Sequence, residues 1–260
     1  MNSVSVRIGG SLLLLSIWSA PAFAQADFTG TWGARYQEDF PERIPGPDLG
    51  DYLGLPINAS ARQFADSWDP SRITLPEEQC RVHVSPYIYR GPLNLRIWED
   101  RDPDTQELVA IKHHISTYDQ TRTIYLDGRP HPPAWAPHTW TGFSTGKWAG
   151  NTLVVTTTHL KDGYLKRSGP QTSDMFTMTE YFTRHGDMLM TTEIIDDPIY
   201  LDEPFIQSTT HQLNINAQLR LEPCTTSFDE NGGSDPHFVD RKSTRLNSSH
   251  RSLSRMPSSA

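Results

Sequence analysis

The sequence predicts a mostly β protein, an antiparallel meander of eight or more strands that closes into a barrel. Between residues 93 and 213, runs rich in β-branched and aromatic side chains alternate with short turn-like joins such as D-R-D-P-D-T, A-G-N and R-H-G-D. Strands separated by joins this short pair antiparallel with their neighbours. A meander of this size must bury one face and protect two edge strands, and closure into a barrel does both.

Each element follows from the local residue pattern. A first strand opens at F-T-G-T-W (28–32) and runs to Tyr36. One short helix is expected over residues 58–68, with Asn58 or Ser60 as its cap and Pro70 as its stop. The other strands are expected at residues 93–99, 108–116, 121–126, 139–148, 152–160, 175–184, 188–195 and 205–213. Long connecting loops, rich in Pro and Gly, are expected at residues 40–56, 75–86 and 130–138.

Two terminal segments are set apart from the fold. Residues 1–24 carry Arg7, an apolar run from Ile8 to Trp18 and a closing A-F-A, which is the pattern of a Sec-type signal peptide cleaved after Ala24. The apolar run is shorter than the roughly 20 residues that span a bilayer. A secreted or periplasmic location is therefore expected, with no integral membrane segment in the mature chain.

The other segment, residues 240–260, resembles a translated sequencing adapter. D-R-K-S-T-R-L-N-S-S-H matches one adapter half, and S-R-M-P-S-S-A matches the end beyond the index. The alternative is a basic, Ser-rich tail that binds an anionic partner. We expect this tail to be artefactual and disordered, with the natural C-terminus missing beyond about Val239. A single β-barrel domain is then expected over residues 25–239, since barrels of this size commonly form one domain.

The expected mature domain is strongly acidic. Without the leader and the tail, the chain has 17 Lys and Arg residues against 30 Asp and Glu residues, a net charge of −13 with His neutral. Such a domain repels nucleic acid and anionic membrane surfaces. A small neutral, apolar or cationic molecule remains as a partner, and no cofactor is expected.

The chain contains two cysteines, Cys80 and Cys224. In an oxidising compartment they are expected to form a disulfide that ties the segment before the strands to the segment after them. Closing so long a loop would stabilise the fold by about 4 kcal/mol in the chain-entropy model. The alternative is a pair of buried free thiols that behave as small apolar residues.

Period-2 alternation places three ionisable side chains on otherwise apolar strand faces. They are His113, His159 and Glu180, each in step with neighbouring Ile, Val, Met or Phe residues. A hydrogen bond in the core, a rim position or a bulge explains any one of them. Three within one barrel predict a polar site in an apolar cavity, with Arg96 at its mouth. These three residues are the catalytic candidates.

Other candidate ligand-binding residues lie in the D-G-R-P-H segment and among the tryptophans. Arg129 offers a bidentate clamp for an anion, and His131 offers a base or an acid. A turn in which Asp127 caps backbone N–H groups explains the same residues without a ligand. Trp98 and Trp140 can stack on a flat ligand or pack in the core and rim. The ten histidines lack zinc-site spacing, so no metal site is expected.

Five motifs carry a resemblance to a known family. They are G-L-P-I-N-A-S-A-R, D-S-W-D, R-x-I-Y-x-D-G-R-P-H-P, G-x-W-x-G-N-T-L-V-V and D-D-P-I-Y-L-x-E-P-F, between Gly54 and about Thr210. The chain resembles a family of uncharacterised secreted bacterial proteins, which implies secretion and a shared fold but no activity. The F-T-G-T-W opening is also similar to the G-x-W opening of lipocalins. That resemblance implies a lipocalin- or calycin-like barrel with Gly30 and Trp32 at its floor, although the long segment 40–86 departs from the lipocalin pattern.

Three function classes fit these observations. The leading hypothesis is a secreted barrel that binds a small apolar or amphipathic molecule. The second is an enzyme, a hydrolase or isomerase, in which His113 or His159 acts as base and Glu180 as acid. The third is an interaction protein that presents the Trp- and Pro-rich loop 130–138.

Overall fold

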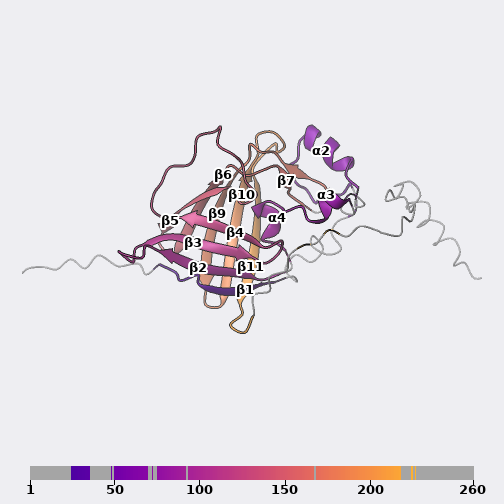
Figure 1. Cartoon of the computed structure of the whole chain (residues 1–260). Helices are drawn as coiled ribbons and strands as arrows, with labels where there is room; N and C mark the ends of the chain where they lie inside the picture. Colours follow the sequence, from indigo (N-terminus) through magenta and orange to yellow (C-terminus); the bar gives the residue numbers. More distant parts are fainter. Residues whose placement is uncertain are drawn as a thin grey trace, which may run out of the picture.

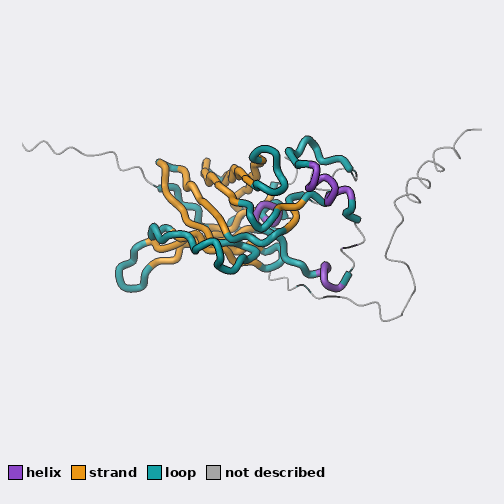
Figure 2. The backbone as a smooth tube through the Cα atoms, turned by 90° about the horizontal axis from the view of Figure 1, so that it is seen from above, coloured by secondary structure: helices purple, strands orange, loops and turns teal. Residues whose placement is uncertain are grey.

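The structure is a computed structural model that describes residues 25–35, 48, 50–69, 72, 75–91, 93–166, 168–217, 224 and 226. Its strands form one closed barrel with the helices gathered at one side (Figures 1 and 2). The predicted leader (1–24), the predicted artefactual tail (240–260) and the expected end of the first strand at Tyr36 lie outside the described residues. No helix in the described part of the chain is long and apolar enough to cross a membrane.

Nine strands close the barrel in the order β1-β11-β10-β9-β6-β5-β4-β3-β2, which confirms the predicted fold class. The predicted strand positions match the observed ones to within a few residues. The barrel strands are β1 (Gly30–Ala34), β2 (Leu95–Arg101), β3 (Leu108–Ile115), β4 (Gln120–Tyr125), β5 (Phe143–Ala149), β6 (Thr152–Thr158), β9 (Thr177–His185), β10 (Met188–Asp196) and β11 (Phe205–Leu213). A small ribbon of β7 (Gly163–Tyr164) and β8 (Gln171–Thr172) interrupts the sequence between β6 and β9.

The expectation that every strand pairs antiparallel with its neighbour is wrong at one place. Strands β4 and β5 pair in parallel, with Ile124 opposite Ser144. A parallel pair requires the chain to return along the full length of the strands before the second strand begins. The Pro-rich segment 126–142 makes this return outside the barrel. It is held there by His131, whose two ring nitrogens bond the hydroxyls of Thr145 and Thr158 at 2.8 and 2.7 Å.

The two ends of the barrel differ in what closes them. The tight turns of the β2–β3, β5–β6 and β9–β10 hairpins lie at one end, together with the start of β1, and we call this the hairpin end. The opposite end, the helical end, carries α2 (Ala59–Asp66) and α4 (Ser85–Ile88), with α3 (Pro76–Gln79) between them in sequence (Figure 1). Helix α2 is the predicted helix, and Asn58 caps it by accepting a hydrogen bond from the backbone N–H of Ala61 at 3.0 Å.

The segment 75–86 contains structure that the loop prediction missed. Helices α3 and α4 each form a single turn with Pro at a first-turn position, where its missing N–H has no cost. Directly after α3, the chain is fixed by the disulfide between Cys80 and Cys224, whose Cα atoms lie 5.6 Å apart. The link ties the helical end to a segment beyond the last strand.

The barrel interior is filled with side chains. One apolar cluster occupies it and includes Trp32, Ile97, Leu153 and Phe182, all at most 2% exposed. A second cluster joins α2 to the loops at the helical end through residues such as Phe176. Trp32 is fully buried, and its indole N–H donates to the carbonyl of Phe28 at 2.9 Å. The start of β1 is therefore anchored inside the hairpin end.

Gly30 should tolerate no side chain. Its φ is +140°, a region that L-residues rarely adopt, and an added Cβ would lie 2.7 Å from Leu213 Cδ1. We expect Gly30→Ala to lower the free energy of unfolding by about 1–3 kcal/mol, measured by urea denaturation. Gly33→Ala in the same strand is the control, because its Cβ would meet atoms only at ordinary contact distance, 3.6 Å or more. Equal effects of the two substitutions would contradict the strain argument.

Candidate functional site

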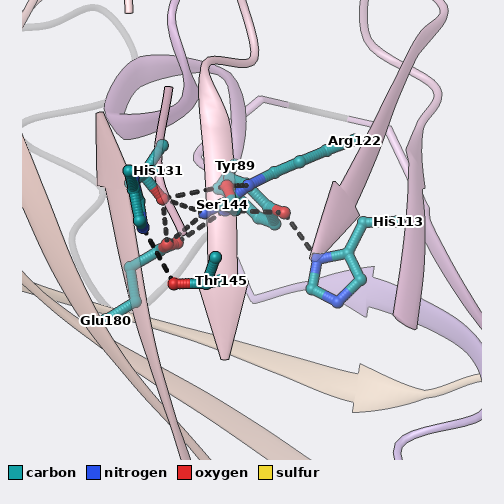
Figure 3. A network of polar contacts seen from close by, with 8 residues as sticks. Tyr89, His113, Arg122, His131, Ser144, Thr145 and Glu180 are labelled. Carbon is teal, nitrogen blue, oxygen red and sulfur yellow. Dashed lines mark hydrogen bonds and ion pairs between the residues drawn. The ribbon is translucent and has the colours of Figure 1, made fainter. Parts of the chain in front are cut away.

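A buried ion pair crosses the middle of the barrel interior (Figure 3). Arg122 of β4 and Glu180 of β9 are 1% and 0% exposed. Arg122 Nη1 donates to Glu180 Oε1 at 2.8 Å, and Nη2 donates to the other carboxylate oxygen, Oε2. Both side chains point inward because they follow the alternation of their strands. The paired geometry satisfies two buried charges that would otherwise be costly in an apolar core.

Three more side chains use the remaining hydrogen-bond capacity of Arg122. Its Nε donates to Ser144 Oγ at 3.0 Å and its Nη2 to Thr157 Oγ1 at 2.6 Å. Its Nη1 also donates to Tyr89 Oη at 3.2 Å. Tyr89 directly follows α4, so it extends from the helical end into the barrel and joins a network with residues of β4, β5, β6 and β9. The guanidinium is thus the centre of the network.

Tyr89 connects this centre to His113 of β3. The distance from Tyr89 Oη to His113 Nδ1 is 2.5 Å. Because the tyrosine oxygen accepts from Arg122, its own proton is available to the histidine nitrogen, an arrangement that requires a neutral imidazole. Burial, with the charges of Arg122 and His211, holds the pKa of His113 well below its usual range. Burial also raises the pKa of Tyr89. His113 and Tyr89 are therefore both uncharged at neutral pH.

A second interior carboxyl, Glu193 of β10, lies directly opposite Glu180 across the β9–β10 pair. Its Oε2 accepts from Gln207 Nε2 at 2.6 Å, and Gln207 Nε2 also donates to the carbonyl of Pro86 at 2.9 Å. Burial first, and then the charge of Glu180, raise the pKa of Glu193 to about 8. Glu193 is thus mostly a neutral acid at pH 7, in contrast to its neighbour in the ion pair.

Three oxygens on β10 and β11 have no hydrogen-bond partner within the described part of the chain. They are Glu193 Oε1, Thr191 Oγ1 and Thr209 Oγ1, on residues that are 0%, 0% and 2% exposed. Thr191 and Thr209 face each other in the β10–β11 register, and Glu193 is two residues further along the same face. We call these residues the β10–β11 triad. Buried polar groups normally have hydrogen-bond partners, so three neighbouring oxygens without one are unusual.

A pocket of about 280 Å³ opens at the hairpin end. The N-terminal segment 25–29 forms one wall, and Phe28 of this segment stacks on Trp148 with ring centroids 5.4 Å apart and planes 10° from parallel. The pocket combines apolar side chains with three charged ones, Asp27, Glu99 and Arg101. Its lining consists of Gln25, Ala26, Asp27, Phe28, Thr29, Ile97, Glu99, Arg101, Leu108, Ile111 and Trp148.

Phe182 lies between the pocket and the polar network. Its ring centroid is 6.4 Å from that of Phe28, which lines the pocket, and 5.3 Å from that of His113. Across the β9–β10 pair, Phe182 is opposite Thr191 of the triad. Because Glu193 of the triad is also opposite Glu180 of the network, the triad lies beside the network and not behind it, and both lie beyond the pocket at the hairpin end.

Two of the three catalytic candidates lie together in the barrel interior, and the third lies outside it. His113 and Glu180 both lie inside the barrel, joined through Tyr89 and Arg122 and not by direct contact. The face assigned to His159 is wrong, because β6 ends at Thr158 and His159 has a φ of +57° that breaks the alternation. Its imidazole Nε2 instead lies 3.0 Å from the carbonyl oxygen of Pro133 in the external loop.

None of the six predicted ligand-binding residues lines the pocket at the hairpin end. On β2, Arg96 alternates with the buried Leu95 and Ile97, so its side chain is exposed outside the barrel and not at the mouth of the interior. Trp98 shares this outer face and is half-buried. The six predicted residues that are absent from the pocket lining are Arg96, Trp98, Asp127, Arg129, His131 and Trp140.

The other four of these residues lie in the Pro-rich segment 126–142, which we call the external strap. Asp127 and Arg129 form an exposed ion pair, and the Arg129 guanidinium lies 3.7 Å from the centroid of the Tyr125 ring. His131 fastens the strap through the threonine hydroxyls described above. Lys161 Nζ lies 5.0 Å from the centre of the Trp140 ring. Their contacts are those of a turn and its packing, as the turn interpretation expected.

Four interior residues escaped the sequence reasoning: Tyr89, Arg122, Glu193 and Gln207. Alternation alone would have found two of them, since Arg122 is in step with Ile124, and Glu193 with Ile195. Tyr89 had no signal, because it follows a single-turn helix that periodicity does not reveal. In the described part of the chain, no three His, Cys, Asp or Glu side chains converge as metal ligands.

No protein-family model, curated protein or solved structure matches the chain. The chemistry of the site therefore rests on its own residues. These provide a small pocket lined by apolar and charged side chains, an ion-pair network further inside the barrel, and, beside that network, a neutral carboxyl and two hydroxyls that have no partner in the described structure.

Proposed function

We propose that this protein is a secreted or periplasmic barrel that binds a small amphipathic molecule at the hairpin end. The pocket of about 280 Å³ beneath the N-terminal segment carries this proposal. Ligand sites are usually concave, mainly apolar and equipped with a few convergent polar groups, and small-molecule pockets begin at about 300 Å³. The leader pattern and the disulfide support an oxidising compartment outside the cytoplasm.

The lining explains why the ligand should be amphipathic. Phe28, Ile111 and Trp148 offer apolar and aromatic surface, while Asp27, Glu99 and Arg101 contribute charged groups to the lining. Arg101 is already paired with Glu99 at 2.7 Å, so the lining has little positive charge to spare for an anion. The net charge of −13 for residues 25–239 also disfavours anionic ligands.

The enzyme hypothesis has weaker support from the geometry. Both oxygens of Glu180 accept hydrogen bonds from Arg122, so a proton on either oxygen would break one of these bonds. Tyr89 occupies Nδ1 of His113. Neither group is therefore arranged as the acid or base of a reacting pair.

The interaction hypothesis would use Trp135, whose side chain is 85% exposed on the strap.

Binding of hexan-1-ol provides a direct test. Trp148 lines the pocket and its indole N–H has no acceptor in the described structure, so its NMR signal should shift in a saturable way as hexan-1-ol is added. Leu108→Trp fills the pocket and should weaken binding at least tenfold, because apolar volume is replaced by an indole ring. Leu53→Trp is the control, since Leu53 is 49% exposed and is not among the pocket residues.

Two results would refute the pocket assignment: no saturable shift in the wild type, or equal affinities in the two variants. Native mass spectrometry of protein purified from a bacterial periplasm complements this test. A small molecule that co-purifies in equimolar amount, and is lost in Leu108→Trp but not in Leu53→Trp, is the expected result.

A further inference from the structure

We propose that the polar end of the ligand is a primary ammonium group, and that the β10–β11 triad of Thr191, Glu193 and Thr209 receives it inside the barrel. This inference rests on the proposed function, because the apolar part of the same ligand would occupy the pocket at the hairpin end. It assigns the ligand to a chemical class, small alkylamines, and gives a role to three buried oxygens.

The triad is compact. Residues directly opposite each other in an antiparallel pair have Cβ atoms about 4.5–5.5 Å apart, which applies to Thr191 and Thr209. Glu193 is the next residue on the same face of β10, about 7 Å along the strand from Thr191. Each of the three offers one oxygen without a partner in the described structure. One head group placed among them can therefore reach all three.

The number and kind of these groups fit an ammonium ion. A primary ammonium has three N–H donors and no acceptor, and the triad offers three oxygens that can accept. Charge-assisted hydrogen bonds of this kind are about twice as strong as neutral ones. Inside a barrel that excludes water, they would also replace the hydration that the ammonium loses on entry.

The charges around the triad can be balanced with one additional cation present. Arg122 from β4 and Glu180 from β9 neutralise each other through their paired hydrogen bonds. From the other elements, His113 of β3 and His211 of β11 face the same interior, and Arg90 after α4 acts on Glu193 from outside the strands. His113 is neutral through its contact with Tyr89. Ionisation of Glu193 would thus add a negative charge that an ammonium can balance.

The route from pocket to triad passes Phe182. This residue is opposite Thr191 in the sheet, and its ring lies 6.4 Å from that of Phe28 in the pocket wall. Phe182 is 1% exposed, so its ring must turn aside before an alkyl chain in the pocket can bring a terminal amine to the triad. The aromatic wall also explains why the ligand should be an alkylamine and not a fully hydrated cation.

The test compares hexan-1-amine with hexan-1-ol in the purified full-length protein and in two variants. At pH 7 we expect the wild type to bind the amine at least tenfold more tightly than the alcohol. Glu193→Gln, which keeps the shape of the side chain, should abolish this preference. Glu203→Gln is the matched control, because it makes the same chemical change at an exposed position.

Proton release provides a second readout. Because the pKa of Glu193 is raised to about 8, a bound ammonium should displace most of one proton per amine at pH 7. Isothermal titration calorimetry in phosphate and in Tris buffer measures this number, since the two buffers differ in their heat of ionisation. Hexan-1-ol should release no proton, and neither ligand should release one from Glu193→Gln.

The outcomes separate the two proposals. If the alcohol shifts the Trp148 signal but the amine binds no better, or if Glu193→Gln keeps the preference, the triad is occupied by something else, such as bound water, and only this inference fails. If neither compound binds at the pocket, the proposed function fails as well. A cooperative unfolding transition in urea verifies that Glu193→Gln is folded.

Discussion

Arg122→Met should lower the free energy of unfolding by about 3–5 kcal/mol. The substitution leaves Glu180, which is 0% exposed, without its cationic partner, and it removes the donors to Ser144, Thr157 and Tyr89. Breaking one side of a buried ion pair is costly because the remaining charge is desolvated and uncompensated. Urea denaturation at pH 7 measures the loss.

A double variant tests whether the lost stability comes from the broken ion pair or from disturbed packing in the core. In Arg122→Met/Glu180→Leu both charges are absent, so most of the lost stability should return, as apolar replacements of buried ion pairs are often neutral. Arg129→Met removes the exposed pair with Asp127 and should have no measurable effect. If the double variant were as unstable as Arg122→Met, the loss would come from packing and not from an orphaned charge.

The second large effect is a dependence of stability on pH that Glu193 should impose. Its pKa is raised from an ordinary value of 4.5 to about 8 in the folded protein. Between these values the folded state holds a proton that the unfolded state has lost, so stability falls as pH rises, by about 1.4 kcal/mol per pH unit and about 5 kcal/mol in total. The effect is complete above pH 8.

The difference between Glu193→Gln and the wild type isolates this contribution. The variant should gain stability relative to the wild type as pH rises from 5 to 8, measured by urea denaturation at each pH. A direct comparison is needed because His83 and His113 act in the opposite sense: burial lowers both pKa values, that of His83 to about 4, so their contribution is lost as pH falls below 6.5. A pH-independent difference would show that Glu193 is not protonated in the folded state.

Much of the fold was predictable because the strands obey a simple rule. Alternation in a half-buried strand decides which side chains point inward, and it placed His113 and Glu180 correctly inside the barrel. The same rule failed at His159, where a backbone angle of +57° ends the alternation one residue after the strand. No pattern of residue types predicts a positive φ angle at a histidine.

The interior site was less predictable because its members come from distant elements. Arg122 and Glu180 belong to β4 and β9, and nothing in either strand indicates that the two will face each other across the barrel. Tyr89 reaches the network from a single-turn helix, which has too few residues to show a period. The parallel pairing of β4 and β5 likewise depends on the connecting segment 126–142, whose path is set by contacts of His131 with β5 and β6.

The position of β1 has a consequence for how the chain folds. This short strand pairs with β2 on one side and with β11 on the other, so the first and last strands of the barrel meet. The hairpins β2–β3, β5–β6 and β9–β10 can form from neighbouring residues, but closure must wait until β11 has been synthesised. Contacts between residues so far apart in sequence make folding slow, in the range of milliseconds to seconds for β-rich domains. Ring closure is therefore expected to be the rate-limiting step, and until then the pocket at the hairpin end lacks the wall that the N-terminal segment provides.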